Sequence, residues 1–324
     1  MNTTKYITKM FGLIFLIGGK RLLGIKKRAD WPLKTELLWA TTRLTLLSSN
    51  KYGLAWLKNL SKSYSPKPIF AEKVSIDAVD SKVGSYLKIA PIANAPQKLI
   101  IYFHGGGYVT GSPKAIVEFS SRLALKTAAL VLTPFYPTAP EKTYPAAHQF
   151  ASAFVQYVLT KYPNSTPFIA GDSAGAALAL SAIKNLNCSL SKRLKGCILI
   201  SPWVDPLAQK GSIQFNSKND VGNREFVVAC YHTYLNGAIP LEKYPLRFDA
   251  QNIPSLPPTF ISIGDTEILL DQTKKLSEDI QTQGTQTTTM VYQGMFHTFW
   301  NMAPRLKEAD RLIEDLANWM HKKN

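Results

Sequence analysis

The residues best suited to chemistry lie in the segment GDSAG, residues 171–175. This G-x-S-x-G pattern follows an apolar run at 167–170, which predicts a strand, and it opens an alanine- and leucine-rich run at 174–186, which predicts a helix. Glycines on both sides remove Cβ atoms that would clash in so tight a turn, so the hydroxyl of Ser173 can stand exposed at the helix N-terminus. The pattern predicts a nucleophilic serine, and an ordinary small-residue turn is the alternative.

A serine hydroxyl needs a base to take its proton, and the chain offers five histidines. His297, in the segment GMFHTFW, comes just after the last predicted strand, whereas the other four lie in predicted helices, before a glycine run or in the C-terminal tail. Where a serine sits on such a turn, the acid and the base follow it in chain order. His297 is therefore the candidate base, and a structural loop histidine is the alternative.

The base in turn needs a carboxylate that holds its tautomer and stabilises the imidazolium. The segment ISIGDTEILLDQ follows the seventh predicted strand and supplies Asp265, Glu267 and Asp271. We expect Asp271 to lie a turn further into the next helix. Spacing alone leaves both Asp265 and Glu267 open as the acid.

A glycine-rich segment, HGGGY at residues 104–108, directly follows the third predicted strand. Three glycines let this loop pass close to the serine, so the backbone N–H groups of Gly105 and Gly106, with that of Ala174, could bind a developing oxyanion. A phosphate cradle is the competing interpretation, but no G-K-[ST] sequence follows.

These motifs must be held by a regular framework, and alternating short apolar runs and longer helical patterns provide one from residue 74 onward. The predicted strands are 74–79, 85–90, 98–103, 129–135, 167–170, 195–201, 258–263 and 288–293. The first two are close enough for an antiparallel hairpin. The later ones are separated by helical patterns, which predicts a mostly parallel eight-stranded sheet with helices on both faces.

Two segments stand outside this alternation and are expected to cover the strand ends. Residues 1–67 are helical in pattern and form a predicted N-terminal cap or lid. Residues 68–324 form the predicted catalytic domain, which contains a cap insertion around 205–257 with a helical pattern at 223–237.

The net charge of +16 is concentrated at the N-terminus, because residues 1–67 hold 13 Lys and Arg against Asp30 and Glu36. This distribution argues against a nucleic-acid-binding protein. The three cysteines show no zinc-ligand or disulfide-scaffold spacing and fit a reducing, cytoplasmic compartment. Neither a metal nor an organic cofactor is expected.

The basic N-terminus leaves three interpretations open. Residues 10–19 are uncharged and largely apolar, but ten residues of helix cover only about 15 Å of the roughly 30 Å of a bilayer core. The segment is a cap helix covering the protein itself, an interfacial anchor whose Lys and Arg meet anionic lipid, or a cleaved signal, although no A-x-A-type cleavage site follows.

The motifs HGGG and GDSAG, with the acid and His297 behind later strands, resemble the hormone-sensitive-lipase-like family of α/β-hydrolase esterases over residues 70–320. The resemblance implies an α/β-hydrolase fold and a serine carboxylesterase that acts on short- to medium-chain acyl esters through Ser173, His297 and an acid. Members with the G-D-x-E-x-L-x-D pattern are expected to use the glutamate, which places Glu267 ahead of Asp265. The alternatives are a membrane-surface lipase or a small-lactone hydrolase with the same triad, and a non-enzymatic small-molecule receptor. A homodimer and peripheral membrane contact are left open.

Overall fold

The computed structural model describes residues 3–93, 95–237, 247–249 and 251–323. Within these residues an eight-stranded sheet runs in the order β1-β2-β4-β3-β5-β6-β7-β8. The strands are β1 (Val74–Val79), β2 (Tyr86–Pro91), β3 (Lys98–Phe103), β4 (Ala129–Pro134), β5 (Thr166–Asp172), β6 (Gly196–Ile200), β7 (Thr259–Gly264) and β8 (Thr287–Tyr292). The eight strands predicted from the sequence are confirmed to within two residues at each end.

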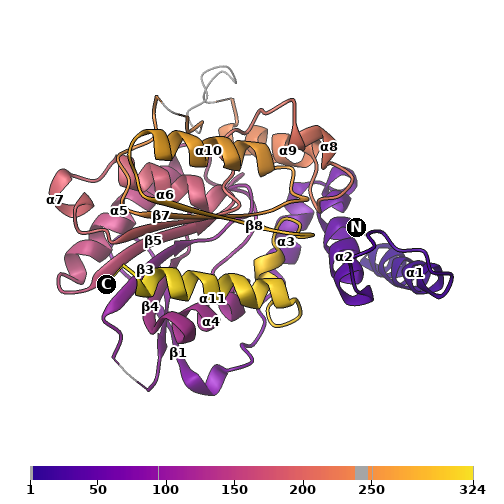
Figure 1. Cartoon of the computed structure of the whole chain (residues 1–324), viewed down its shortest axis with the longest axis horizontal. Helices are drawn as coiled ribbons and strands as arrows, with labels where there is room; N and C mark the ends of the chain where they lie inside the picture. Colours follow the sequence, from indigo (N-terminus) through magenta and orange to yellow (C-terminus); the bar gives the residue numbers. More distant parts are fainter. Residues whose placement is uncertain (1–2, 94, 238–246, 250, 324) are drawn as a thin grey trace.

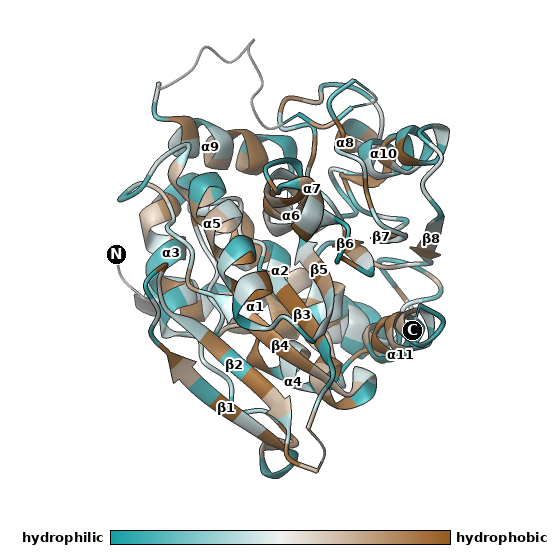
Figure 2. Ribbon diagram, turned by 90° about the vertical axis from the view of Figure 1, so that its left-hand side faces the viewer, coloured by the Kyte–Doolittle hydropathy of each residue, from teal (hydrophilic) through white to brown (hydrophobic). Residues whose placement is uncertain are grey.

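The direction of the strands also agrees with the sequence prediction. β1 and β2 pair antiparallel, β2 pairs antiparallel with β4, and every later pairing from β3 to β8 is parallel. β3 and β4 are mostly hydrophobic, whereas β1 and β2 alternate between hydrophobic and hydrophilic residues (Figure 2). This difference is expected because central parallel strands are covered on both faces and edge hairpins are partly solvated.

Helices cover both faces of the sheet (Figure 1). α5 (Ala146–Lys161), α6 (Ala174–Lys184) and α10 (Leu270–Thr282) pack on one face, and α4 (Val117–Thr127) and α11 (Lys307–His321) pack on the other. The apolar stripe of α11 is buried throughout, including Leu312 and Leu316. The remaining short elements are η1 (Ala71–Lys73), α7 (Cys188–Ser191), α8 (Ser212–Phe215), α9 (Arg224–Leu235) and η3 (Phe299–Met302).

The N-terminal cap consists of α1 (Thr3–Leu22), α2 (Leu33–Tyr52) and α3 (Leu54–Ser63). It gathers at one end of the sheet, with α1 outermost (Figure 1). Three side chains tie it to the rest of the protein: Trp31 Nε1 donates to the carbonyl of Gly294, after β8 (2.8 Å), Lys58 Nζ to that of Ala139, after β4 (2.6 Å), and Trp39 Nε1 to that of Asn219 in the insertion (2.7 Å). The cap is therefore fixed over the carboxyl ends of the strands.

The insertion around 205–257 contributes α8 and α9 to the same end of the molecule, and α9 coincides with the helical pattern at 223–237. Residues 238–246 and 250 of this insertion lie outside the described residues. Of the helices in the described part of the chain, none combines the length and the apolar character needed to cross a membrane.

Candidate active site

Ser173 occupies a strained turn between β5 and α6. Its backbone angles are φ 53° and ψ −121°, a conformation that a non-glycine residue adopts only when its surroundings impose it. The neighbouring glycines impose it by close packing: a Cβ atom on Gly171 would overlap the Gly175 carbonyl, and one on Gly175 would overlap the Phe103 carbonyl at the end of β3. The glycine spacing seen in the sequence thus has a steric cause.

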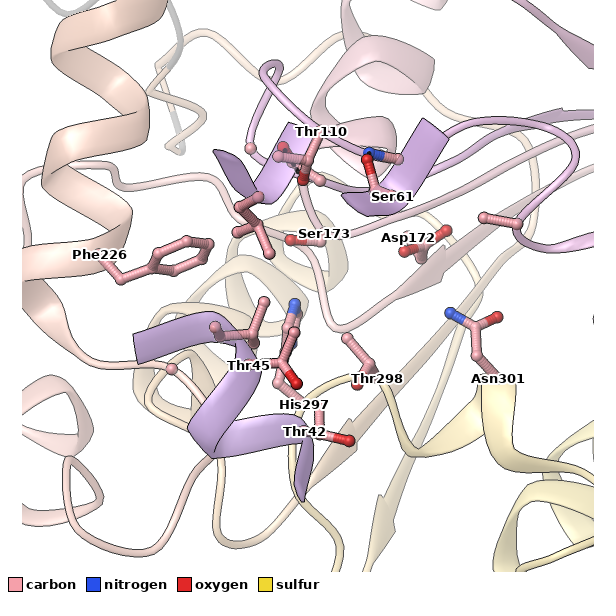
Figure 3. A pocket seen from close by; sticks show the side chains of 18 of the residues that line it. Thr42, Thr45, Ser61, Thr110, Asp172, Ser173, Phe226, His297, Thr298 and Asn301 are labelled. Carbon is pink, nitrogen blue, oxygen red and sulfur yellow. Dashed lines mark hydrogen bonds between the residues drawn. The ribbon is translucent and has the colours of Figure 1, made fainter. Parts of the chain in front are cut away.

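His297 follows β8 and lines the same cavity as Ser173. Its Nδ1 lies 2.7 Å from Glu267 Oε2, and its ring packs edge-on against Trp300 with 5.2 Å between ring centres. Figure 3 shows the imidazole directed toward the Ser173 side chain. Because Nδ1 faces a carboxylate, the neutral ring carries its proton there and leaves Nε2 free as an acceptor.

The pKa of His297 results from opposing effects. Burial on its own lowers this pKa, but the hydrogen bond and the charge of Glu267, together with the charges of Asp220 and Asp172, outweigh burial and raise it above the ordinary value of 6.5. The imidazole is thereby made a stronger proton acceptor than a free histidine.

Glu267 is fully buried behind β7 and is held on both carboxylate oxygens. Oε1 accepts hydrogen bonds from Ser201 Oγ and from the Gly264 backbone N–H, each at 2.7 Å, and Oε2 faces His297. Asp265, the other acid that the spacing left open, is half-buried and accepts a hydrogen bond from the Gly294 backbone N–H (2.7 Å). The structure therefore brings Glu267, not Asp265, to the imidazole.

The glycine loop after β3 lies beside Ser173, and Gly105, Gly106 and Gly107 all line the cavity. His104 holds the loop in place through Tyr136. Its ring stacks on that of Tyr136, and the Tyr136 hydroxyl donates to the His104 carbonyl (2.7 Å). Burial lowers the pKa of His104 to about 4, so this histidine is neutral near pH 7. Of the sequence-predicted donors, Ala174 directly follows the serine in the chain, and Gly106 lines the same cavity.

Asp172 precedes the serine, is buried and lines the cavity. It accepts a hydrogen bond from Tyr102 Oη (2.8 Å), and the backbone N–H of Gly105 also interacts with its carboxylate. Burial raises its pKa to about 6, against the lowering effect of Tyr102, His297 and Gly105. The Gly105 backbone thus lies against a carboxylate of the protein itself.

The cavity has a volume of about 570 Å³, and the N-terminal cap closes much of it. Tyr6 of α1 donates to or accepts from Thr45 Oγ1 of α2 (2.6 Å) within this wall. The cap residues that line the cavity are Tyr6, Leu38, Thr41, Thr42, Thr45, Leu46, Leu57, Leu60, Ser61 and Tyr64. Apart from its threonines and one serine this wall is apolar or aromatic, which suits the hydrocarbon part of a ligand.

Sequence reasoning missed several residues that support the site. Ser201 directly follows β6, next to β7 in the sheet, and this position at a carboxyl end was a signal that could have found it. Asp220 lies in the insertion, far from any strand, and no local pattern marks it. In the described part of the chain, no group of three or more His, Cys, Asp or Glu side chains could hold a metal ion.

Comparison with known proteins places the chain in a family. Residues 100–301 match a family described as having the alpha/beta hydrolase fold. An acetyl-hydrolase of Streptomyces hygroscopicus is 33% identical over 225 residues, covering 67% of this chain and 73% of the relative. An esterase of Acinetobacter venetianus is 31% identical over 229 residues, covering 70% and 75%.

Solved structures give the same result. The crystal structure of a hormone-sensitive lipase from a metagenome library superposes with a TM-score of 0.74 at 25% identity, covering 88% of this chain and 98% of that one. The chain therefore belongs to the α/β-hydrolase-fold family, in its hormone-sensitive-lipase-like group.

Proposed function

We propose that the protein is a serine carboxylesterase that hydrolyses short- to medium-chain acyl esters through an acyl-enzyme. One observation carries the proposal: the His297 imidazole, paired with Glu267, lies on the same cavity as the strained Ser173. The names of two relatives, acetyl-hydrolase and esterase, support the same class of reaction.

In the proposed reaction Ser173 Oγ attacks the ester carbonyl carbon while His297 Nε2 takes its proton, and Glu267 holds the imidazole and stabilises the imidazolium. The backbone amides of Gly105, Gly106 and Ala174 are the proposed oxyanion donors. Because the Gly105 backbone lies against the Asp172 carboxylate, Gly106 and Ala174 carry more of this assignment. His297 then protonates the leaving alcohol, and a water molecule, deprotonated by His297, hydrolyses the acyl-enzyme.

The cavity supports an acyl group of modest length. A volume of about 570 Å³ is within the range of small-molecule sites, and its cap wall is largely apolar. Activity on p-nitrophenyl esters should therefore be highest for acyl chains that fit between Ser173 and the cap and should fall for long chains.

Replacing the nucleophile tests the proposal most directly. Ser173→Ala should lower kcat for p-nitrophenyl butyrate by roughly 10⁶-fold, by comparison with other triad serines. Ser181→Ala, on the same helix but further along α6, is the matched control and should keep wild-type turnover. Turnover by the purified, folded Ser173→Ala protein would overturn the assignment.

The same site could also serve a small-lactone hydrolase or a lipase, and substrate panels distinguish them. A lactone that competes with the ester and is opened with higher kcat/KM would favour the first, and preference for emulsified long-chain esters would favour the second. A non-enzymatic receptor on this fold would have no need of a base, and His297 with its carboxylate argues against it.

A specific observation favours membrane contact as a second property. α1 buries one side against α2, including Ile17, but leaves large apolar side chains exposed: Phe11 is 57% exposed, Phe15 77% and Leu23, just beyond the helix, 78%. Ile7, Phe11, Ile14 and Phe15 follow helical spacing and share one face. Exposed contiguous apolar faces of this kind mark interaction surfaces.

We propose that this face binds the anionic, cytoplasmic surface of a membrane bilayer. Residues 1–28 hold seven Lys and Arg and no acidic residue, and each cation near an anionic surface contributes about 1 kcal/mol. A second copy of the chain would bring the same positive charges and be repelled. The cysteines Cys188, Cys197 and Cys230 are free, which fits the reducing compartment that faces the anionic leaflet.

Vesicle binding tests the contact. Wild-type protein should sediment with phosphatidylcholine vesicles containing about 30% phosphatidylserine and far less with pure phosphatidylcholine. The triple change Phe11→Ser, Phe15→Ser and Leu23→Ser should abolish sedimentation but keep butyrate hydrolysis. Phe215→Ser, at an exposed phenylalanine on α8, is the control and should bind as wild type. Loss of dimerisation in the triple variant, without any vesicle binding by wild type, would refute the proposal in favour of a second copy.

A further inference from the structure

Asp220 lies in the loop between α8 and α9 and is completely buried. Its carboxylate accepts three backbone N–H groups. Oδ1 accepts from Val221 (2.7 Å) and from His297 (2.8 Å), and Oδ2 accepts from Ile268 (2.8 Å). One side chain from the insertion therefore joins the loop that carries His297 to the residue that follows Glu267.

The same loop holds the acid segment at a second point. Asn216 Nδ2 donates to the carbonyls of Asp265 (3.1 Å) and Glu267 (2.9 Å). The backbone on both sides of Glu267 is thus fixed from the insertion, in addition to the contacts that the Glu267 side chain makes with Ser201 and Gly264.

α2 holds this loop from the opposite side. Trp39 Nε1 donates to the Asn219 carbonyl (2.7 Å), and the Arg43 guanidinium donates to the carbonyl of Asp220 itself. Burial lowers the pKa of Arg43, and the charge of Asp220 opposes that effect. The N-terminal cap consequently contacts the segment that positions the imidazole, as well as lining the cavity.

Asp220 also contributes charge. The charged groups that face it are Glu267, His297 and Arg43, and burial followed by the Glu267 charge raises its pKa to about 6. The groups that face His297 are Glu267, Asp220 and Asp172, all of which favour its protonated form. At neutral pH a charged Asp220 therefore stabilises the imidazolium that forms when Ser173 loses its proton.

We propose that Asp220 is a positioning residue for ester hydrolysis: it fixes the backbone of His297 against that of Glu267 and favours the imidazolium, and α2 holds it in place through Trp39 and Arg43. This inference rests on the proposed function. It assigns no contact between Asp220 and the substrate, so its effect should fall on kcat and on the pH profile and leave KM nearly unchanged.

Asp220→Asn is the test because it keeps the shape and one acceptor oxygen. That oxygen can still accept from His297 and Val221, but the new NH₂ group then meets the Ile268 N–H, and the negative charge is lost. We expect kcat for p-nitrophenyl butyrate to fall about 10- to 100-fold, as for loss of a hydrogen bond to a charged group, with KM changed by less than about threefold. The kinetic pKa of the base should move to lower pH.

The matched control is Asp271→Asn. Asp271 also accepts a backbone N–H of the insertion, from Ser212 (2.7 Å), but faces α8 rather than His297. This variant should keep the wild-type kcat and pH profile. Active sites are counted by titration with a phosphonate ester, so that misfolded protein does not lower the apparent kcat. A purely structural role would reduce the number of active sites but leave their kinetic pKa unchanged.

A second variant keeps the inference testable if Asp220→Asn does not fold. Arg43→Met removes the donor to Asp220 from a half-exposed position on α2 and should lower kcat about three- to tenfold. Wild-type kcat and pH profile per active site in the folded variants would overturn the role of Asp220. Turnover by Ser173→Ala would instead overturn the proposed function, so the two failures are distinguishable.

Discussion

Exchanging the acid for its amide gives the sharpest test of the site. Glu267 Oε1 accepts from two donors, Ser201 Oγ and the Gly264 N–H, so the oxygen of a glutamine at this position must stay on that side. The glutamine NH₂ then faces His297 Nδ1. Two donors cannot share that contact, so the imidazole must move its proton to Nε2, the nitrogen that has to accept the proton of Ser173.

The expected loss follows from that tautomer. In a triad of known geometry the equivalent change from acid to amide lowers kcat by about 10⁴-fold, and we expect a similar loss for Glu267→Gln. Asp265→Asn should change kcat by less than about tenfold, because its carboxylate accepts the Gly294 N–H and does not face His297, and one hydrogen bond of this kind contributes about 1 kcal/mol.

Both variants are assayed with p-nitrophenyl butyrate at saturating substrate, per active site, and their melting temperatures are compared with wild type. Two outcomes would contradict the prediction: a kcat for Glu267→Gln within tenfold of wild type, or a large loss of kcat in an Asp265→Asn variant that melts normally. Either would show that the carboxylate at 265 supports the base. The hydrogen bonds of Glu267 would then not mark the acid of the triad.

Three further changes give clear expectations. The acidic limb of kcat/KM should lie above pH 6.5, because the neutral imidazole is required and activity is lost as pH falls through the raised pKa of His297; a pH–rate profile with its limb at or below 6.5 would contradict this. Burial raises the pKa of Asp172 from 3.8 to about 6, so the charged carboxylate costs about 3 kcal/mol of stability as pH rises through that window. Urea unfolding should show that Asp172→Asn gains stability relative to wild type between about pH 4 and about pH 7. A difference in unfolding free energy between the two proteins that does not change with pH would be evidence against this cost. Gly175→Ala should lose more than about 1 kcal/mol of stability and most activity in melting and ester assays, since its Cβ overlaps the Phe103 carbonyl. The control Gly18→Ala, in open space on α1, should be neutral or stabilising.

The parts of the molecule that follow from local pattern could be predicted from the sequence. The eight strands were recognisable because each is a short apolar run between turns, and their alternation with helices predicted the parallel sheet. Ser173 was recognisable because its two glycines are needed where the turn touches the end of β3. His297 followed from its place behind the last strand, since parallel strands bring their carboxyl ends to one edge.

Other features depend on contacts between distant segments, and the spacing of residues alone does not reveal them. Glu267 and Asp265 are two residues apart, and only the folded backbone decides that one faces the imidazole and the other Gly294. Asp220 is separated from His297 by 77 residues, and its role depends on a loop conformation that no periodicity encodes. The close approach of Gly105 to Asp172 likewise depends on how the loop is folded.

One part of the cavity wall and the reacting groups come from separate stretches of chain: the N-terminal cap contributes residues between 6 and 64 to the wall, whereas Ser173, Glu267 and His297 all follow the third strand. Grafting the first segment of a relative onto this hydrolase would therefore change which acyl groups fit without altering the chemistry. The graft requires a donor for each of the carbonyls that Trp31, Trp39, Arg43 and Lys58 now satisfy. Compatible donors at these four positions are thus the first feature to match when choosing a segment to exchange.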